Sequence, residues 1–157
     1  MPSGLQNFIH TFFAWSQIKA VFLPLLRTGL LNTIVLSLGS IVLGVVIGMV
    51  LAVALLSTRP WVRFPARVYV DVFRGLPIIL TILLIGEGLP IAGLHIFGRS
   101  AYPYAVLALG VVSGAYIAEI FRSGIQSVDR GQLEAARCLG LSHFWAMALV
   151  VIPQGVR

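Results

Sequence analysis

The chain has 157 residues, of which 59% are hydrophobic and 10% are charged, and its formal net charge is +6. Soluble domains carry about a quarter charged residues, so this composition excludes an ordinary soluble domain and indicates a membrane protein. The basic residues are spread along the chain rather than gathered in one stripe, which argues against nucleic acid as a partner. A single cysteine, Cys138, excludes an internal disulfide and a cysteine-based metal cluster.

Residues 1–27 precede the first long apolar stretch. Their mixture of aromatic and polar side chains is typical either of an amphipathic helix at the membrane interface or of a poorly ordered leader. No basic region precedes the apolar residues, as it would in a cleavable signal peptide.

Residues 28–56 are predicted to form the first membrane crossing. They carry no charge, and a helix of about 20 residues is enough to cross a bilayer core. Gly44 and Gly48, with Ser40 and Ala52, recur at every fourth position. This spacing predicts a ridge of small side chains that another helix can approach closely.

Residues 57–74 are interpreted as a cytoplasmic loop because they carry four arginines: Arg59, Arg63, Arg67 and Arg74. Pro60 and Pro65 are expected to interrupt the preceding helix. Asp71 is spaced to pair with Arg74. Binding of an anionic lipid or substrate is an alternative role for this charge, although marking the topology explains most such runs.

Residues 75–94 are predicted to form a second crossing that glycine and proline residues weaken at both ends. Broken helices are tolerated inside membranes where the backbone faces protein or a water-filled cavity. Glu87 falls in the outer broken part. It is a candidate contact for a cationic substrate group on the transport path, and a solvated carboxylate at the interface is the alternative.

Residues 102–118 are predicted to form a third crossing, with Gly110 and Gly114 continuing the four-residue spacing of small side chains. Tyr116, late in this helix, is either an interfacial anchor or a contact on the substrate path. Glu119 is a further candidate for the substrate path, and a structural ion pair with Arg122 is the alternative.

Residues 119–143 are predicted to form a second cytoplasmic loop that contains a short two-faced helix. Asp129 can cap the start of this helix, with Gln132 in capping-box spacing, and Gly140 suits a left-handed residue at its end. Ser142 can start the next helix, so residues 144–157 are interpreted as the beginning of a further segment. With both basic loops inside, the N-terminus is expected outside.

Leu133, Ala136 and Leu139 recur at helical spacing in this loop and predict a thin apolar stripe on the short helix. Such a helix is too short to be stable alone, so it needs something to dock against. An ordinary loop helix at the membrane interface is the alternative.

The sequence contains few motifs that are typical of catalytic or metal sites. The only lysine, Lys19, follows Ile18, so the chain has no Gly-Lys-Ser or Gly-Lys-Thr phosphate loop. The three histidines lack metal-ligand spacing, and no Gly-x-Ser-x-Gly element is present. We therefore expect neither an enzyme nor a metal or cofactor on this chain.

Three motifs together resemble one family. Glu134-Ala135-Ala136 followed by Gly140 resembles the EAA loop of importer-type ABC permeases. The segment from Gly114 to Ile125 and the element Arg74-Gly75-Leu76-Pro77 are similar to segments of their polar-amino-acid branch. The likeness runs from about Leu26 to Arg157, with departures at Leu76, Asp129 and Cys138, where the family favours other residues.

The resemblance implies an all-α, multi-spanning helical membrane protein like the transmembrane domain of a type I ABC importer. That domain usually has five crossings, so a chain with three is expected to be truncated at its C-terminus. The loop would form the coupling helix, in which Glu134, Ala135, Ala136 and Gly140 engage a groove on the ATPase.

The implied function is translocation of a polar amino acid across the cytoplasmic (inner) membrane. ATP and magnesium would be held by cytosolic P-loop ATPase subunits, and the further partners would be a second permease subunit and an external substrate-binding protein. A non-transporting scaffold or a truncated remnant of such a permease is the alternative. An ion-driven transporter would need paired intramembrane acids, and only Glu87 comes near this requirement.

Overall fold

The structure is a computed structural model that describes Gly4, Phe8, residues 15–98 and residues 100–155. In these residues it contains helices and connecting turns but no strand, as the all-α prediction requires. Residues group into two compact units, Met1–Leu38 and Gly39–Arg157. Two stretches, Ile18–Leu56 and Ala101–Ser127, are long and apolar enough to cross a membrane, and a bent pair of helices adds a third span if it counts as one.

The first unit contains α2 (Trp15–Pro24), η1 (Leu25–Gly29) and the start of α3 (Leu30–Leu56). A helical segment therefore occupies the end of the predicted leader, while most of residues 1–14 lie outside the described residues. Pro24 has no N–H to donate, and the hydrogen bonding widens to the π pattern directly after it. The Thr33 hydroxyl donates a hydrogen bond to the carbonyl of Gly29, the last residue of η1, at 2.9 Å.

The second unit is built around α3 and α7 (Ala101–Ser127), which approach closely at their small residues. A Cβ placed on Gly44 would lie 2.8 Å from the Cβ of Ser113, and one on Gly114 would lie 2.9 Å from the Cβ of Ile47. Gly48 and Gly110 leave equally little room. The two four-residue ridges therefore face each other, and glycine permits the approach because it has no side chain.

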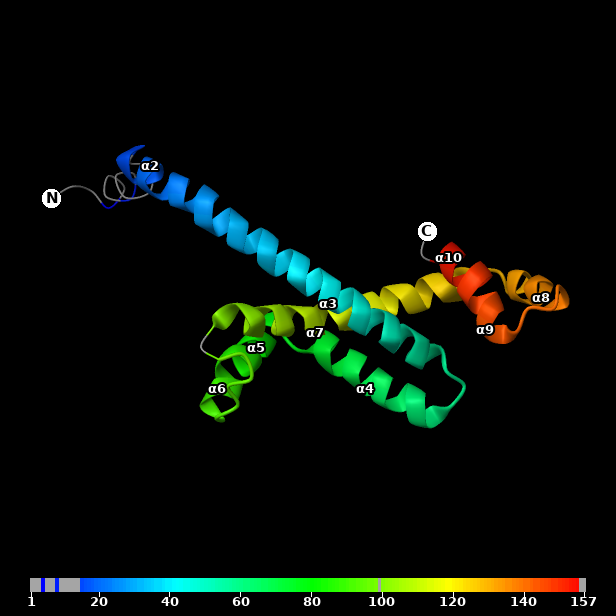
Figure 1. The fold of residues 1–157 in the computed structure, drawn as a ribbon. Coiled ribbons are helices and arrows are strands. Elements are labelled where there is room, and N and C mark those ends of the chain that lie inside the picture. Colours follow the sequence, from blue (N-terminus) through cyan, green and yellow to red (C-terminus); the bar gives the residue numbers. More distant parts are fainter. Residues whose placement is uncertain (1–3, 5–7, 9–14, 99, 156–157) are drawn as a thin grey trace. The chain divides into compact units, whose positions relative to one another are not determined.

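Residues 57–74 differ from the predicted loop, since α4 (Pro60–Gly75) occupies most of them. Pro60 stands at the first helical position, where its missing N–H costs nothing. Ala66 and Val70 lie one turn apart and are buried against Leu55 and Ala118, so α4 returns beside α3 and α7 (Figure 1). Packing of this one apolar edge stabilises a helix that carries four charged residues and several exposed hydrophobic ones on its other positions.

The predicted second crossing contains one helix, Ile78–Ile91, in which a π-helical turn, η2 (Leu84–Gly88), lies between α5 (Ile78–Leu83) and α6 (Leu89–Ile91). The chain bends by 107° between Pro60–Gly75 and Ile78–Ile91. Leu76 is extended, with ψ 138°, because the ring of Pro77 disfavours a helical conformation in the residue before it. Residues 75–94 therefore do not form one continuous helix.

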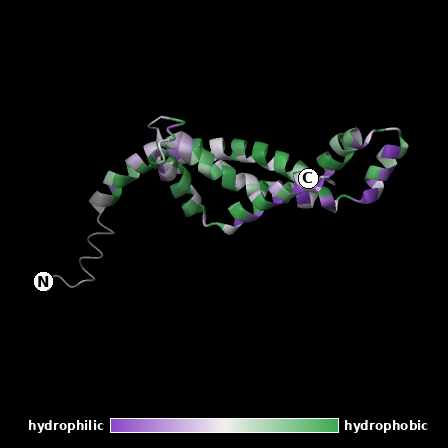
Figure 2. Cartoon of the chain, turned by 90° about the horizontal axis from the view of Figure 1, so that it is seen from below, coloured by the Kyte–Doolittle hydropathy of each residue, from purple (hydrophilic) through white to green (hydrophobic). Residues whose placement is uncertain are grey.

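The third predicted crossing continues beyond residue 118, because α7 extends to Ser127. The loop that follows holds α8 (Arg130–Cys138), then α9 (His143–Ala146), η3 (Met147–Val151) and α10 (Ile152–Gly155). Figure 2 shows hydrophobic residues along α3 and α7 and hydrophilic residues on α8.

Candidate functional site

The short helix α8 is fixed at both ends by its own sequence. Asp129 is the N-cap, and its Oδ1 accepts a hydrogen bond from the Gly131 N–H at 2.6 Å. At the other end Gly140 has φ 88°, and its N–H donates to the Arg137 carbonyl while Leu141 donates to that of Ala136. This pair of bonds is the Schellman motif, which ends a helix sharply. The predicted left-handed Gly140 is confirmed.

The predicted capping box does not form, because Asp129 accepts from the Gly131 N–H rather than from that of Gln132. The Gln132 side chain does not return to the start of its own helix, but accepts a hydrogen bond from Gln154 Nε2 at 3.4 Å. Gln132 therefore ties α8 to α10. The same region brings α10 against α7, where a Cβ on Gly124 would overlap the backbone of Gly155. Gly124 stands in the Gly114–Ile125 segment singled out from the sequence, but nothing in the sequence indicates that it meets Gly155.

One face of α8 is packed and the other is open. Ala136 is buried, whereas Glu134, Ala135 and Cys138 are exposed. Leu139 departs from the predicted apolar stripe: it is 85% exposed because it is the C-cap and lies outside the regular helix. The open face thus combines the Glu134 carboxylate and the Arg137 guanidinium with small side chains and an exposed leucine.

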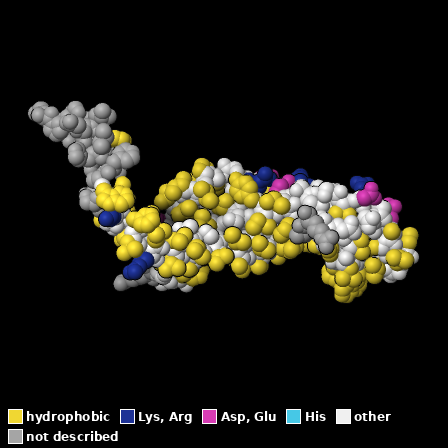
Figure 3. Space-filling view, turned by 90° about the horizontal axis from the view of Figure 1, so that it is seen from above, with side chains coloured by type: hydrophobic (Ala, Val, Ile, Leu, Met, Phe, Trp, Pro, Cys, Tyr) yellow, Lys and Arg dark blue, Asp and Glu magenta, His cyan; other side chains and the backbone are white. Residues whose placement is uncertain are grey.

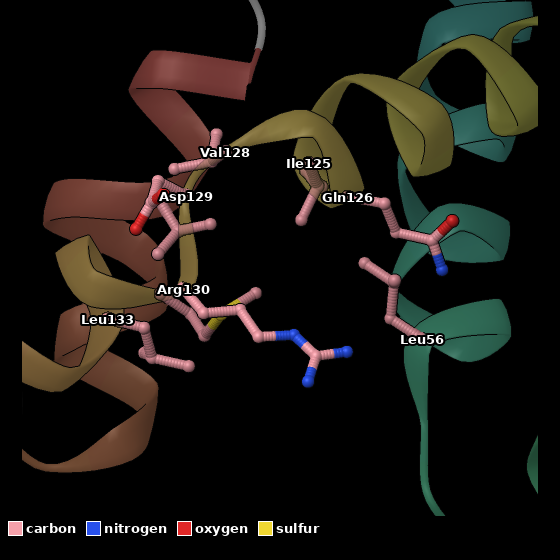
Figure 4. Close-up of a pocket in the computed structure, with 9 residues that line it drawn as sticks. Leu56, Ile125, Gln126, Val128, Asp129, Arg130 and Leu133 are labelled. Atoms are coloured by element: carbon pink, nitrogen blue, oxygen red, sulfur yellow. The ribbon is translucent and has the colours of Figure 1, made fainter.

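Behind α8 lies a cavity of about 280 Å³ between the end of α7, the end of α3 and η3. Figure 4 shows Leu56 of α3 on one side and Leu133 of α8 on the other, with Arg130 extending between them. Arg130 and Leu133 of α8 line this cavity, so part of the inner face of α8 is not packed against the rest of the chain. A second surface that covers the open face would therefore add substantially to its stability.

The three candidates for the substrate path lie on two elements. Tyr116 and Glu119 are three residues apart on α7, and Glu87 lies exposed on η2. The Arg74 guanidinium lies over the Tyr116 ring, 5.6 Å from its centroid. Within the described part of the chain Arg74 forms no ion pair with Asp71, so that predicted pair is wrong.

The predicted Glu119–Arg122 ion pair forms, with an N–O distance of 2.5 Å. Figure 3 shows the charged side chains of the second unit gathered along one edge of that face, with hydrophobic side chains over most of the rest. Among the described residues, no group of three or more His, Cys, Asp or Glu side chains could hold a metal ion.

Residues 44–157 match the family described as "Binding-protein-dependent transport system inner membrane component". The chain belongs to this family. It is 37% identical over 134 residues to a probable amino-acid ABC transporter permease protein, YckA, of Bacillus subtilis, covering 85% of this chain and 58% of that protein. It is also 37% identical over 150 residues to the glutamate/aspartate import permease GltK of Escherichia coli, covering 92% and 66%.

A solved structure described as an amino acid ABC transporter with histidines matches with a TM-score of 0.76 at 40% identity. That match covers 90% of this chain and 64% of the solved one. The chain therefore spans about two thirds or less of these relatives. Membership of the family places it among multi-spanning inner-membrane components, in agreement with its apolar helices.

Proposed function

We propose that the chain is the membrane-spanning permease subunit of an ABC importer that carries a polar amino acid, with ATP hydrolysed by a separate subunit. The observation that carries this proposal is α8: a short helix, capped at both ends, whose exposed face holds Glu134 in the EAA motif. Family membership and amino-acid permeases among the relatives support it.

The substrate class is proposed from the relatives' names. These include permeases for glutamate/aspartate, arginine and L-cystine, whose side chains differ in charge. What such substrates share is the α-amino acid head group. We propose transport of an amino acid and leave its side chain open.

We propose a separate task for each residue of the motif. Glu134 and Ala135 lie on the exposed face, where they would meet a groove on the ATPase. Ala136 faces inward and anchors the helix, and Gly140 sets the turn that directs the chain into α9. Closure of two ATPase subunits around ATP and magnesium would move α8, and α10 and α7 would carry the motion into the membrane helices.

Further partners follow from this proposal. A second permease subunit, identical or related, would complete the pathway, and an external binding protein would deliver the substrate. Both arginine-bearing segments would then face the cytosol and the N-terminus would lie outside. Tyr116, Glu119 and Glu87 are proposed as contacts along the path, of which the first two share one face of α7.

The test is co-purification in mild detergent, followed by identification of the proteins that accompany the wild-type chain. We expect a P-loop ATPase, and we expect Glu134→Arg to lose it while the chain still inserts into the membrane. Thr58→Arg is the matched control, because it adds a positive charge at an exposed position in the α3–α4 connection. An inserted wild-type chain that brings down no ATPase would instead favour the scaffold.

A further inference from the structure

A second cavity, of about 90 Å³, lies between α4 and α7, apart from α8. Its lining is dominated by charge, with five charged residues from the two helices: Arg67, Asp71, Arg74, Glu119 and Arg122. It adjoins α7, a helix long and apolar enough to span a membrane. Arg67, Asp71 and Arg74 are exposed, so a ligand from solution can reach them.

Two of these charges satisfy each other. Arg122 donates to Glu119 through Nε at 3.0 Å and through a terminal nitrogen at 2.5 Å, which is a bidentate pair. Its remaining terminal nitrogen donates to Gln126 at 2.6 Å. This pair adds no net charge to the cavity.

The other three charges come from a single face of α4. Arg67, Asp71 and Arg74 are four and three residues apart, which aligns them on a helix. In the described part of the chain, neither Arg67 nor Asp71 has an ion-pair partner within 4.0 Å, and Arg74 is held over the Tyr116 ring. The cavity therefore offers two positive charges and one negative charge to a ligand.

Buried residues directly beside this charged face hold it in place, and one of them, Val70, also lines the cavity. Val70 is 2% exposed and packs with Ala66 against α3 and α7. The Tyr69 hydroxyl donates to the carbonyl of Val111 at 2.9 Å, which fixes α4 along α7. A face positioned before binding loses less entropy when it binds a ligand.

We infer that this cavity binds the head group of an α-amino acid, with the carboxylate at Arg67 and Arg74 and the ammonium at Asp71. The inference rests on the proposed function. A guanidinium matches a carboxylate in charge and geometry, and Asp71 repels a simple anion but attracts an ammonium group. A single water needs about 10–15 Å³ of cavity volume measured in this way, so the cavity has room for a group of several heavy atoms such as an amino-acid head group.

The experiment measures binding to the purified full chain in lipid nanodiscs by isothermal titration. The probes are L-glutamine, L-arginine and L-glutamate, each also as its N-acetyl form and as its α-amide, with inorganic phosphate as a simple anion. For at least one free amino acid, the dissociation constant is expected to be at least about tenfold lower than that of its N-acetyl form and that of its α-amide. Each modification removes one charge-assisted contact.

The variants give the sharper result. Arg67→Gln should bind the free amino acid about tenfold or more weakly and should no longer distinguish it from its α-amide. Asp71→Asn should no longer distinguish it from its N-acetyl form. Arg63→Gln is the matched control, since Arg63 lies one turn before Arg67 on α4 but outside the cavity lining, and it should bind like the wild type.

Three results overturn the inference: equal affinities for Arg67→Gln and Arg63→Gln, no binding of any free amino acid by the wild type, or phosphate binding that exceeds amino-acid binding. The proposed function is judged separately in the same preparations. If a P-loop ATPase still co-purifies while the head-group pattern is missing, the cavity assignment is wrong and the permease function stands. If the head-group pattern is present but no ATPase accompanies the chain, the assignment to an ABC importer fails instead.

Discussion

The close approach of α3 to α7 at Gly48 makes a quantitative prediction for Gly48→Ala. The added Cβ would lie 2.6 Å from Ile117 Cγ2, 2.8 Å from Ile117 Cβ and 3.1 Å from the Ala118 nitrogen. Carbon atoms in favourable contact are about 3.5–4.0 Å apart, so the two helices must separate locally by about 1 Å. Ile117 cannot rotate its own Cβ away, because that atom is fixed by the backbone.

Such overpacking typically costs about 1–3 kcal/mol, while alanine in place of glycine favours a helix by up to about 1 kcal/mol. Gly86→Ala separates the two contributions, because its Cβ would meet nothing within 4 Å. It gains the helical preference without the clash. We therefore expect Gly48→Ala to be less stable than Gly86→Ala by about 1–3 kcal/mol in free energy of unfolding.

The assay is reversible unfolding in mixed micelles with increasing dodecyl sulfate, followed by far-ultraviolet circular dichroism. If Gly48→Ala and Gly86→Ala unfold at the same detergent fraction, the two glycine ridges do not pack as the structure has them, and the reasoning is refuted.

Three further predictions concern α8 and α4. Gly140 has φ 88°, so Gly140→Val should destabilise this turn by about 1–2 kcal/mol and reduce substrate-stimulated ATPase activity. Gly140→Asn should retain most of that activity, because asparagine tolerates the left-handed conformation. Equal activities of the two variants would contradict this prediction. Asp129→Ala should increase amide hydrogen exchange at Gly131 and in the first turn of α8, since a lost N-cap costs about 1 kcal/mol; unchanged exchange would show that the cap is dispensable. Tyr69→Phe should lower the free energy of unfolding by about 1 kcal/mol, as it removes the hydrogen bond to Val111; stability equal to the wild type would argue against that bond.

Local chemistry explains which parts of the fold the sequence could predict. The α-helical class follows from long uncharged stretches, and the end of α8 follows from Gly140, whose conformation is set within a few residues. The four-residue spacing of Gly44 and Gly48 indicates a packing face. The spacing does not indicate which helix packs on this face, because the contact with α7 joins residues far apart in the chain.

Features that depend on tertiary contacts were predicted less well. Arginines and prolines make residues 57–74 resemble a loop, whereas burial of Ala66 and Val70 against α3 and α7 stabilises a helix there. Gln132 has capping-box spacing, yet its side chain bonds to Gln154 on a later segment. The cavity beside α4 was missed for the same reason, since Arg67 and Glu119 meet only after the helices pack.

The most direct test of α8 as the ATPase-docking helix uses the only cysteine of the chain, Cys138, which is exposed on the same helix as Glu134. The rate at which a maleimide modifies Cys138 can be measured for the isolated chain and for the complex with its co-purified ATPase. Docking at α8 predicts strong protection of Cys138 in the complex, and recovery of the isolated-chain rate when Glu134→Arg releases the ATPase. Equal modification rates with and without bound ATPase would contradict docking at this helix.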